Sequence, residues 1–261
     1  MVEIEKVKKT KEKISFTVRD ADQAIVNAIR RSIFEIPVLA IDEVEFYKND
    51  SALYDEMLAH RLGLVPLKAP KTFKVKENCT CKGEGCLKCT ATLKLKAVGP
   101  VTIYSGDLKG KGCEVVFKDM PIVILAKDQE LELSATACLG KALDHTKFSP
   151  GMIWFTSLPN IKLDKETETY IDIAEVCPKK AIIIKGNKIE IDPLKCDVCE
   201  ACIEYCNNKN KKALDISFSD RDFLFNVESF GQLEPEEIFL ESIEALNCNL
   251  DEFEKLVSKA K

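Results

Sequence analysis

Apolar and polar residues alternate along several short stretches of the chain, the period-two pattern that is typical of half-buried β-strands. These stretches cover 14–18, 40–46, 93–98, 115–117, 152–156 and 223–228. From about residue 62 to residue 155 almost every predicted element is a strand. Gly106, Gly110 and Gly112 lie between two strand-like runs, so they predict a hairpin loop and not a phosphate-binding loop.

Other segments have the three-and-four spacing of amphipathic helices. One helix is predicted over 20–34, with Asp20 as its cap and Pro37 ending it, and a shorter one over 53–61. A final helix begins at Pro235, in the favoured first-turn position. Its apolar residues recur at steps of four and three: Phe239, Ile243, Leu246, Leu250, Phe253 and Val257. Such a seam packs on a neighbouring helix of this chain or of another, although an ordinary core helix gives the same pattern.

Composition and charge fit a globular protein. The chain has 261 residues, 46% hydrophobic and 31% charged, which favours one large domain or two to three small ones. The net charge of −5 is unevenly spread, with 11 Lys against 4 acids in 66–118 and 12 acids against 4 bases in 215–261. This asymmetry indicates either that the two segments contact different partners or that each one simply forms a well-solvated surface. With no bilayer-length apolar run and no signal-peptide pattern at the start, we expect a cytoplasmic protein.

The 12 cysteines suggest metal binding, because cytosolic thiols stay reduced. The strongest motif is Cys196-x2-Cys199-x2-Cys202, followed by Cys206 and preceded by Cys177-Pro178. A run at this spacing lets one loop offer three thiolates to an iron–sulfur cluster, while the fourth thiolate comes from a distant segment.

The fourth ligand is predicted from the rule that the last cysteine of each ferredoxin run binds the other cluster. Non-cysteine residues occupy the positions of a second upstream triplet: Thr167, Tyr170 and Ile173. The surviving cluster is therefore assigned to the triplet plus Cys177, which a predicted hairpin over 181–191 folds back toward it. Cys206 would be a free or structural thiol. Cys206 as the fourth ligand, and zinc in place of the cluster, remain alternatives.

A second group reads Cys79-x-Cys81-x4-Cys86-x2-Cys89, with a glycine-containing turn at 82–85. Four thiols this close can surround one tetrahedral zinc ion, and two disulfides are the rival interpretation. Either would staple a small subdomain. The other three cysteines are interpreted as small hydrophobes: Cys113, Cys138 and Cys248. With only two histidines and no Ser-His-Asp pattern, no catalytic residue is assigned.

Several longer motifs carry a family resemblance. They are Asn-Ala-Ile-Arg-Arg at 27–31, Pro37, Ala-Ile-Asp at 40–42, Asn49, Ser51, Leu53, Asp-Glu at 55–56, Ala-His-Arg-Leu-Gly-Leu-Val-Pro-Leu at 59–67, Gly140, His145, Lys147, Ser149, Pro150, 227–231 and 235–236. In these residues the chain resembles the family of D-type subunits of archaeal RNA polymerase, related to the third-largest eukaryotic polymerase subunit and the bacterial α N-terminal domain. Phe148 stands where the family has Trp. The gap between Cys81 and Cys86 is one residue longer than in the eukaryotic relatives, which hold zinc there.

This resemblance implies an α+β fold with a discontinuous, α-subunit-like dimerisation domain. Its two parts would be 1–44 and 215–261. Between them would lie a mostly-β insert domain over 45–162, carrying the cysteine loop 79–89, and a ferredoxin-like iron–sulfur domain over 163–214.

The resemblance also implies partners and a function. The helix over 20–34 and the C-terminal helix would pack on the smaller L subunit, and the pair would support two large catalytic subunits and the small subunits N and P. Arg30, Arg31 and Arg61 would contact a large subunit or act as surface charge. The expected role is a non-catalytic assembly platform of DNA-directed RNA polymerase, touching DNA only through the complex. Its structural cluster would be 4Fe-4S, or 3Fe-4S when oxidised. The alternative is a ferredoxin-like electron carrier or oxidoreductase subunit.

Overall fold

The computed structural model describes residues 2–163, 172–185, 188–209 and 214–260. It divides into two compact units, each assembled from separate stretches of the chain. The first unit consists of Met1–Lys8, Ser15–Asn27 and Trp154–Asn226. The second unit consists of Lys9–Ile14, Ala28–Ile153 and Val227–Lys261. These divisions differ from the domain limits expected from the sequence, which remain a prediction.

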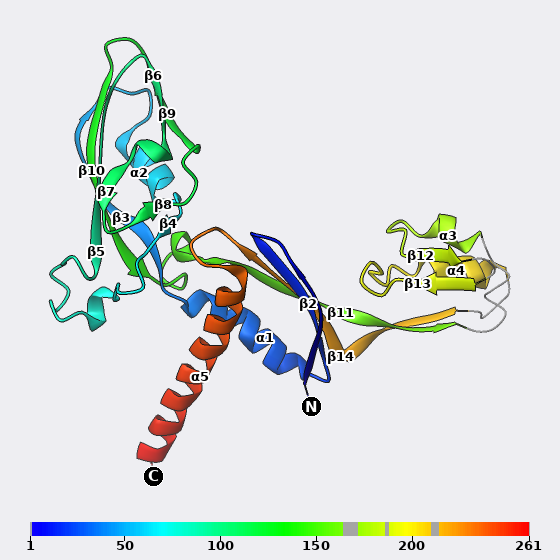
Figure 1. Ribbon diagram of the computed structural model, residues 1–261. Coiled ribbons are helices and arrows are strands. Elements are labelled where there is room, and N and C mark those ends of the chain that lie inside the picture. Colours follow the sequence, from blue (N-terminus) through cyan, green and yellow to red (C-terminus); the bar gives the residue numbers. More distant parts are fainter. Residues whose placement is uncertain (1, 164–171, 186–187, 210–213, 261) are drawn as a thin grey trace. The chain divides into compact units, whose positions relative to one another are not determined.

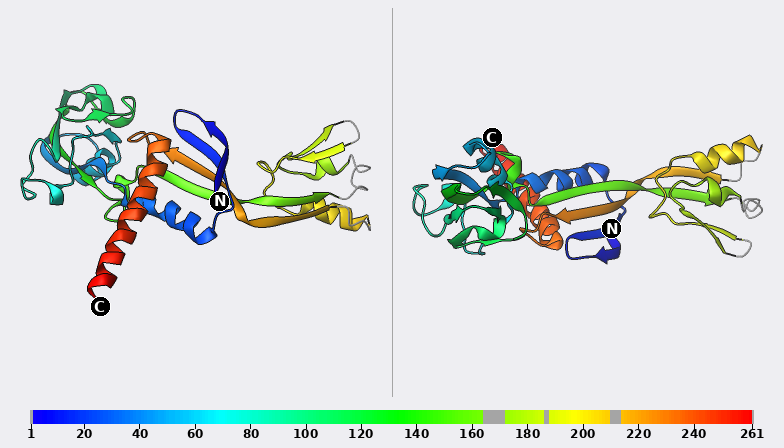
Figure 2. Two further views of the ribbon diagram at one scale, coloured as in Figure 1. Left: turned by 60° about the horizontal axis from the view of Figure 1, so that its bottom comes forward. Right: turned by 90° about the horizontal axis from the view of Figure 1, so that it is seen from above.

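The first unit is built on a four-stranded sheet in the order β1-β2-β14-β11 (Figure 1). Its strands are β1 (Glu3–Lys9), β2 (Lys13–Arg19), β14 (Leu214–Ser229) and β11 (Gly151–Leu163). Aromatic rings fill its centre: Phe16 stacks on Phe225 with centroids 5.5 Å apart, and Phe155 meets Phe223 edge-on at 5.5 Å. The long strands β11 and β14 run side by side in both views of Figure 2. Both extend well beyond the strands predicted at 152–156 and 223–228.

A small lobe of the first unit follows β11 and precedes β14. It contains α3 (Ile173–Val176), β12 (Ile182–Lys185), β13 (Lys188–Ile191) and α4 (Ala201–Asn208). Strands β12 and β13 pair antiparallel, which confirms the two strands of the predicted hairpin. The turn at 186–187, and the positions Thr167 and Tyr170, lie outside the described residues.

The second unit holds a four-stranded antiparallel sheet, β3-β10-β5-β7. These strands are β3 (Val38–Asn49), β10 (Glu130–Gly140), β5 (Thr90–Val98) and β7 (Lys109–Lys111). Two short pairs accompany the sheet. They join β4 (Leu67–Lys68) to β8 (Glu114–Val115), and β6 (Val101–Tyr104) to β9 (Pro121–Leu125). Helix α2 (Asp55–Gly63) buries Leu58 and Leu62 in the core of this unit.

The helix predicted over 20–34 begins later than expected. Helix α1 covers Gln23–Ser32 and is followed by the 3-10 turn η1 (Ile33–Glu35). Asp22 accepts the backbone N–H of Ala24 at 2.7 Å and so takes the capping role assigned to Asp20. Asp20 instead has a left-handed φ of 54°. Within the expected apolar face, Ile25 is 58% exposed, whereas the neighbouring Val26 is buried.

Helix α5 runs without a break from Pro235 to Lys259 (Figure 1). Glu234 and Glu237 form a reciprocal capping box at its start, and Pro235 occupies its first turn as predicted. Its first half buries Ile238 and Ser242, and the helix packs against η1. Among the described residues, no helix is long and apolar enough to cross a membrane.

Polar motif residues shape the turn from β3 into α2. Asn49 donates its amide to the carbonyl of Leu53 at 2.9 Å and to the carboxylate of Asp55 at 2.7 Å. The hydroxyl and backbone N–H of Ser51 donate to the side-chain oxygen of Asn49 at 2.6 and 3.0 Å. These bonds hold residues 49–54 in a turn, so that α2 starts at Asp55 and not at the predicted residue 53.

Lys147 joins two motifs that are far apart in the sequence. Its ammonium group donates to Asp42 at 2.8 Å, and its side chain is only 14% exposed. This hydrogen bond lowers the pKa of the Asp42 carboxyl. The adjacent Phe148 ring lies so close to Gly140 that a Cβ there would come within 2.6 Å of it. The family resemblance of 40–42 and of 140–150 therefore rests on residues that meet in the fold.

We expect Lys147→Met to lower the free energy of unfolding at pH 7 by about 1–2 kcal/mol. The loss is no larger because Asp42 is partly exposed and solvent screens the pair. A lowered carboxyl pKa contributes stability above the ordinary Asp pKa of about 3.9, and this contribution disappears as the pH falls through the lowered value. The difference from wild type should therefore shrink below about pH 4. Urea unfolding at pH 7 and at acidic pH measures this.

Lys141→Met is the matched control, because Lys141 pairs with Glu35 at 3.0 Å in a more exposed setting. It should cost less than about 1 kcal/mol at pH 7. Equal losses for the two variants would contradict a structural role for the Lys147 pair.

Candidate metal centres

Four cysteine sulfurs converge in the second unit. The sulfurs of Cys79 and Cys86 lie 3.6 Å apart, those of Cys81 and Cys89 3.6 Å, and those of Cys86 and Cys89 3.8 Å. All four ligand atoms lie within 4.8 Å of one another. Cys79 and Cys89 are buried, whereas Cys81 and Cys86 are half-buried. The four cysteines that the sequence spacing grouped together therefore do lie close together in the structure.

Backbone turns produce this convergence. The N–H of Lys82 donates to the carbonyl of Cys79 at 3.0 Å, and that of Cys89 to Cys86 at 2.9 Å. Between these two turns the chain reverses at Gly83 and Gly85, whose φ angles of 89° and 93° lie in the region that glycine adopts freely. The glycines thus allow two cysteine pairs only a few residues apart to face each other.

The sulfur separations match a single tetrahedral metal ion. Zinc–thiolate bonds of about 2.3 Å in tetrahedral geometry place neighbouring sulfurs about 3.8 Å apart. A disulfide joins its sulfurs at about 2.05 Å, and all 12 cysteines of the chain are free in the structure. Hydrogen bonds from the Cys79 thiol and the Gly85 N–H lower the pKa of Cys81 to about 6. A lowered thiol pKa favours the deprotonated form that metal binding requires.

A second set of cysteines surrounds a cavity in the small lobe of the first unit. Its lining includes the four cysteines predicted to hold an iron–sulfur cluster: Cys177, Cys196, Cys199 and Cys202. Apolar side chains close it, among them Ile182, Ile191 and Ile216. Cys206 does not line this cavity, although it lies one helical turn from Cys202 on α4 and is buried.

Backbone N–H groups point at several of these sulfurs. The N–H of Ala181 donates to the Cys177 sulfur at 3.3 Å. Burial raises the pKa of Cys196, and a bond from the Val198 N–H opposes that rise. Val198 and Glu200 have left-handed φ angles of 54° and 62°, so the backbone wraps around the sulfurs. Hydrogen bonds to sulfur are among the features that tune iron–sulfur clusters.

The two cysteine sets differ in size. Among the described residues, only the set at 79–89 brings three or more His, Cys, Asp or Glu ligand atoms within 4.8 Å of one another. The sulfurs around the lobe cavity are therefore spread more widely than a single ion requires. Burial raises the pKa of Cys202 to about 11, with the nearby Cys196 adding to the rise. Burial also raises the pKa of Cys206, but no other cysteine contributes to that shift.

The remaining candidates have structural surroundings. Arg61 donates to the backbone carbonyl of Pro121 at 2.7 Å, and Arg31 is exposed. Arg30 is half-buried and has an interaction partner. Both histidines, His60 and His145, line a hollow of about 220 Å³ beside the Asp42–Lys147 pair. The N–H donors to the cysteine sulfurs had no sequence signal, because any non-proline residue can supply one.

Known proteins resemble this chain over nearly its full length. The family model described as the RNA polymerase Rpb3/RpoA insert domain matches residues 43–155, which include the cysteine loop. The chain is 36% identical to the DNA-directed RNA polymerase subunit Rpo3 of Pyrococcus horikoshii, over 97% of this chain and 96% of the relative. It is 32% identical to the Rpo3 subunits of Archaeoglobus fulgidus, over 99% of both chains, and of Methanopyrus kandleri, over 95% and 92%.

Cobalt binding tests the centre at 79–89. We expect the full chain to bind one Co²⁺ at this site with the intense thiolate-to-metal absorption of a four-sulfur tetrahedral complex, and Cys89→Ser to weaken this band strongly. Cys113→Ser removes a thiol outside both sets and should leave the band unchanged. The titration with Co²⁺ uses protein prepared without iron. The variant Cys196→Ser, which alters the lobe cysteines, is titrated in parallel, so that cobalt binding at the two centres can be told apart. A band that survives Cys89→Ser but not Cys196→Ser would contradict the assignment.

Proposed function

Because the chain belongs to the family of the archaeal DNA-directed RNA polymerase subunit Rpo3, we propose that it is a non-catalytic assembly subunit of that enzyme. The observation that carries this proposal is the match to Rpo3 subunits over nearly the full length of both chains. The resemblance inferred from the motifs at 27–67 is thereby confirmed. Polymerase activity belongs to the complex, and this chain contributes surfaces on which other subunits assemble.

The helix α5 supports a heterodimer with the smaller L-type subunit. From Asn247 to Ala260 every residue is exposed, although the predicted apolar seam continues there. Leu250 and Phe253 are 57% and 66% exposed. An apolar stripe of this kind on a regular helix suits a helix of a partner, which would pack into the seam. Ile25 of α1, in the first unit, is also an exposed apolar residue and a separate candidate for a partner contact.

The cavity in the small lobe supports one iron–sulfur cluster held by Cys177, Cys196, Cys199 and Cys202. Four thiolates, wide sulfur spacing and N–H groups directed at sulfur suit a cluster of several iron atoms. The lobe has a small buried core, so the cluster would act mainly by holding its loops together. The loop at 79–89 would hold zinc in the same structural sense.

The other contacts follow from membership of the polymerase. The two large catalytic subunits and the small subunits N and P would contact remaining surfaces of this chain, with Arg31 and Arg61 as candidates for the large ones. DNA would be reached only through the complex. An electron carrier is the alternative, favoured by the exposed Cys199 beside the cavity. Full-length similarity to a polymerase subunit makes it the weaker candidate.

The seam of α5 is tested by Leu250→Ser together with Phe253→Ser. Burying each side chain against a partner is worth about 1.5–3 kcal/mol, so the pair should weaken binding to a co-expressed L-type subunit at least about a hundredfold. Glu252→Ser together with Lys255→Ser is the matched control on the opposite face of the same turns, with a similar cost in helix propensity. Affinity is read by titration calorimetry. Equal affinity of the two double variants would reject the seam as the dimer contact.

The cluster is tested after anaerobic purification by measuring iron and acid-labile sulfide together with the electron paramagnetic resonance spectrum. Cys196→Ser should lose most of the iron, whereas Cys206→Ser should retain it, because Cys206 lies outside the cavity. Iron loss in Cys206→Ser with retention in Cys177→Ser would reverse the assignment of the fourth ligand. Unchanged binding of the L-type subunit by Cys196→Ser would show that the cluster does not support assembly.

A further inference from the structure

A groove of about 330 Å³ follows strand β9 in the second unit. It is lined by four consecutive residues of the strand, 121–124, and by Ala52, Leu53 and Arg61. Consecutive side chains of a strand point to opposite faces of its sheet, so a groove that touches all four residues lies along the edge of the strand. The groove therefore gives access to the main chain of β9 as well as to its side chains.

This edge of β9 has no strand beside it among the residues that the structure describes, because β9 and β6 form a two-stranded sheet. Main-chain N–H and C=O groups of an antiparallel strand alternate between its two edges, so every second residue of β9 directs them away from β6. Arg61 donates to the carbonyl of Pro121 at 2.7 Å, which leaves 122–125 for pairing with another chain. Proline and charged residues usually protect an exposed edge from such pairing. Here Pro121 protects only the first position, and 122–125 contains no charged residue.

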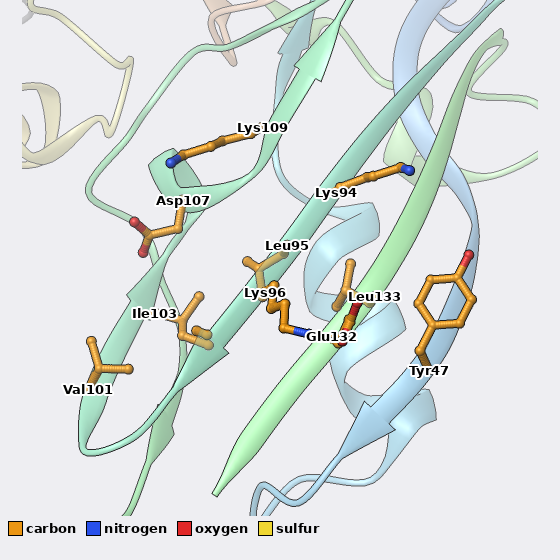
Figure 3. Close-up of a pocket in the computed structure, with 11 residues that line it drawn as sticks. Tyr47, Lys94, Leu95, Lys96, Val101, Ile103, Asp107, Lys109, Glu132 and Leu133 are labelled. Atoms are coloured by element: carbon orange, nitrogen blue, oxygen red, sulfur yellow. Dashed lines mark hydrogen bonds and ion pairs between the residues drawn. The ribbon is translucent and has the colours of Figure 1, made fainter.

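The outer face of β9 is apolar and accessible. Val123 lies opposite Ile103 of β6, which lines the hollow of about 550 Å³ beside Tyr47 (Figure 3). Val123 and Ile103 are at most 6% exposed, whereas Ile124 is on the opposite face of the strand pair and is 70% exposed. An edge strand that carries an exposed isoleucine is a template for a strand of another chain.

Helix α2 extends this apolar surface on the other side of the groove. Tyr54, Met57 and Leu64 are 80%, 54% and 49% exposed. Together with Arg61 they follow one another at steps of three, four and three along α2 and its two flanking residues, so they share one side of the helix. Scattered single apolar residues are normal on a surface, but a stripe next to an unpaired strand edge is typical of an interaction site.

Arg61 stands between the helix stripe and the strand. Among the described residues that line the groove it alone is charged, and it makes no ion pair with any residue that the structure describes. Its guanidinium group has five N–H donors, of which the bond to Pro121 uses one. The remaining donors can bind a carboxylate, which an arginine holds with two parallel hydrogen bonds.

From these observations we propose that an extended segment of another protein subunit pairs with β9 in this groove. One apolar side chain of the segment covers Ile124, and one of its carboxylates binds Arg61. The unpaired edge selects an extended main chain as its occupant, because only such a chain offers donors and acceptors at the spacing of a strand. The inference rests on the proposed function, which makes that subunit another component of the polymerase. The surface is separate from the cysteine centres and from α5.

Competition for assembly tests the contact. Wild-type chain and the variant Ile124→Lys are co-expressed in equal amounts with the other polymerase subunits, and mass spectrometry measures their ratio in the purified complex. Ile124→Lys should be incorporated about tenfold less than wild type or lower, because it places a charge where an isoleucine would be buried. Leu143→Lys is the matched control: Leu143 is 63% exposed in the same unit, outside the groove, and its variant should enter as well as wild type. Thermal unfolding of both variants checks that each is folded.

Hydrogen exchange tests the strand pairing itself. Amides within 122–125 should exchange about tenfold more slowly or less in the complex than in the isolated chain, because pairing adds main-chain hydrogen bonds. Unchanged exchange at 122–125, or equal incorporation of Ile124→Lys and Leu143→Lys, would overturn the docking surface while leaving the assembly role intact. Failure of the wild-type chain to enter the polymerase would overturn the proposed function, and this inference with it.

Discussion

The gathering of four cysteines around one cavity is the constraint on which the small lobe of the first unit depends. Among the residues that the structure describes, its buried core cluster has seven members, and two of them are Cys202 and Cys206. So little apolar surface cannot hold the loops together by packing alone. The left-handed backbone at Val198 and Glu200 adds a cost of about 1 kcal/mol or more at each residue. In the proposed centre, bonds from the cysteines to a bound cluster would offset both deficits, so that cluster binding and folding of this lobe would be one process.

The same reasoning applies on a smaller scale to the loop at 79–89. Here glycine takes two of the three positive φ angles, at Gly83 and Gly85, while Lys82 has a φ of 55°, and the loop closes over very few residues. The result is a narrower sulfur set, suited to one ion. The two cysteine sets differ in size because the chain reverses differently in each. In the second unit a short turn with glycines reverses the chain, whereas in the first unit a hairpin brings a distant cysteine back.

Local patterns predicted local structure well. Cysteine spacing predicted which cysteines lie together at 79–89 and which line the lobe cavity, and the first-turn proline located the start of α5. The ends of elements that pair with distant segments were not predicted. Strands β11 and β14 are long because they are hydrogen-bonded to each other, and the alternation of residues within either strand does not reveal this pairing. Asp20 lost its cap role because a polar residue two positions later was equally suited. The Asp42–Lys147 pair spans about a hundred residues, and the hollow beside Tyr47 collects residues from five strands, so neither has a sequence period to detect.

The C-terminal half of α5 is the part of the structure that bears most directly on the proposed assembly, because its apolar residues are exposed. A helical segment this short, with no packing along it, is marginal in water on propensity alone. Its apolar residues are exposed in the isolated chain, so a partner that covers Leu250 and Phe253 would add to its stability. Partner binding would then order the segment as well as bury it. Part of the interaction free energy would be spent on that ordering, so the affinity for the proposed partner would be lower than the buried apolar area alone would indicate.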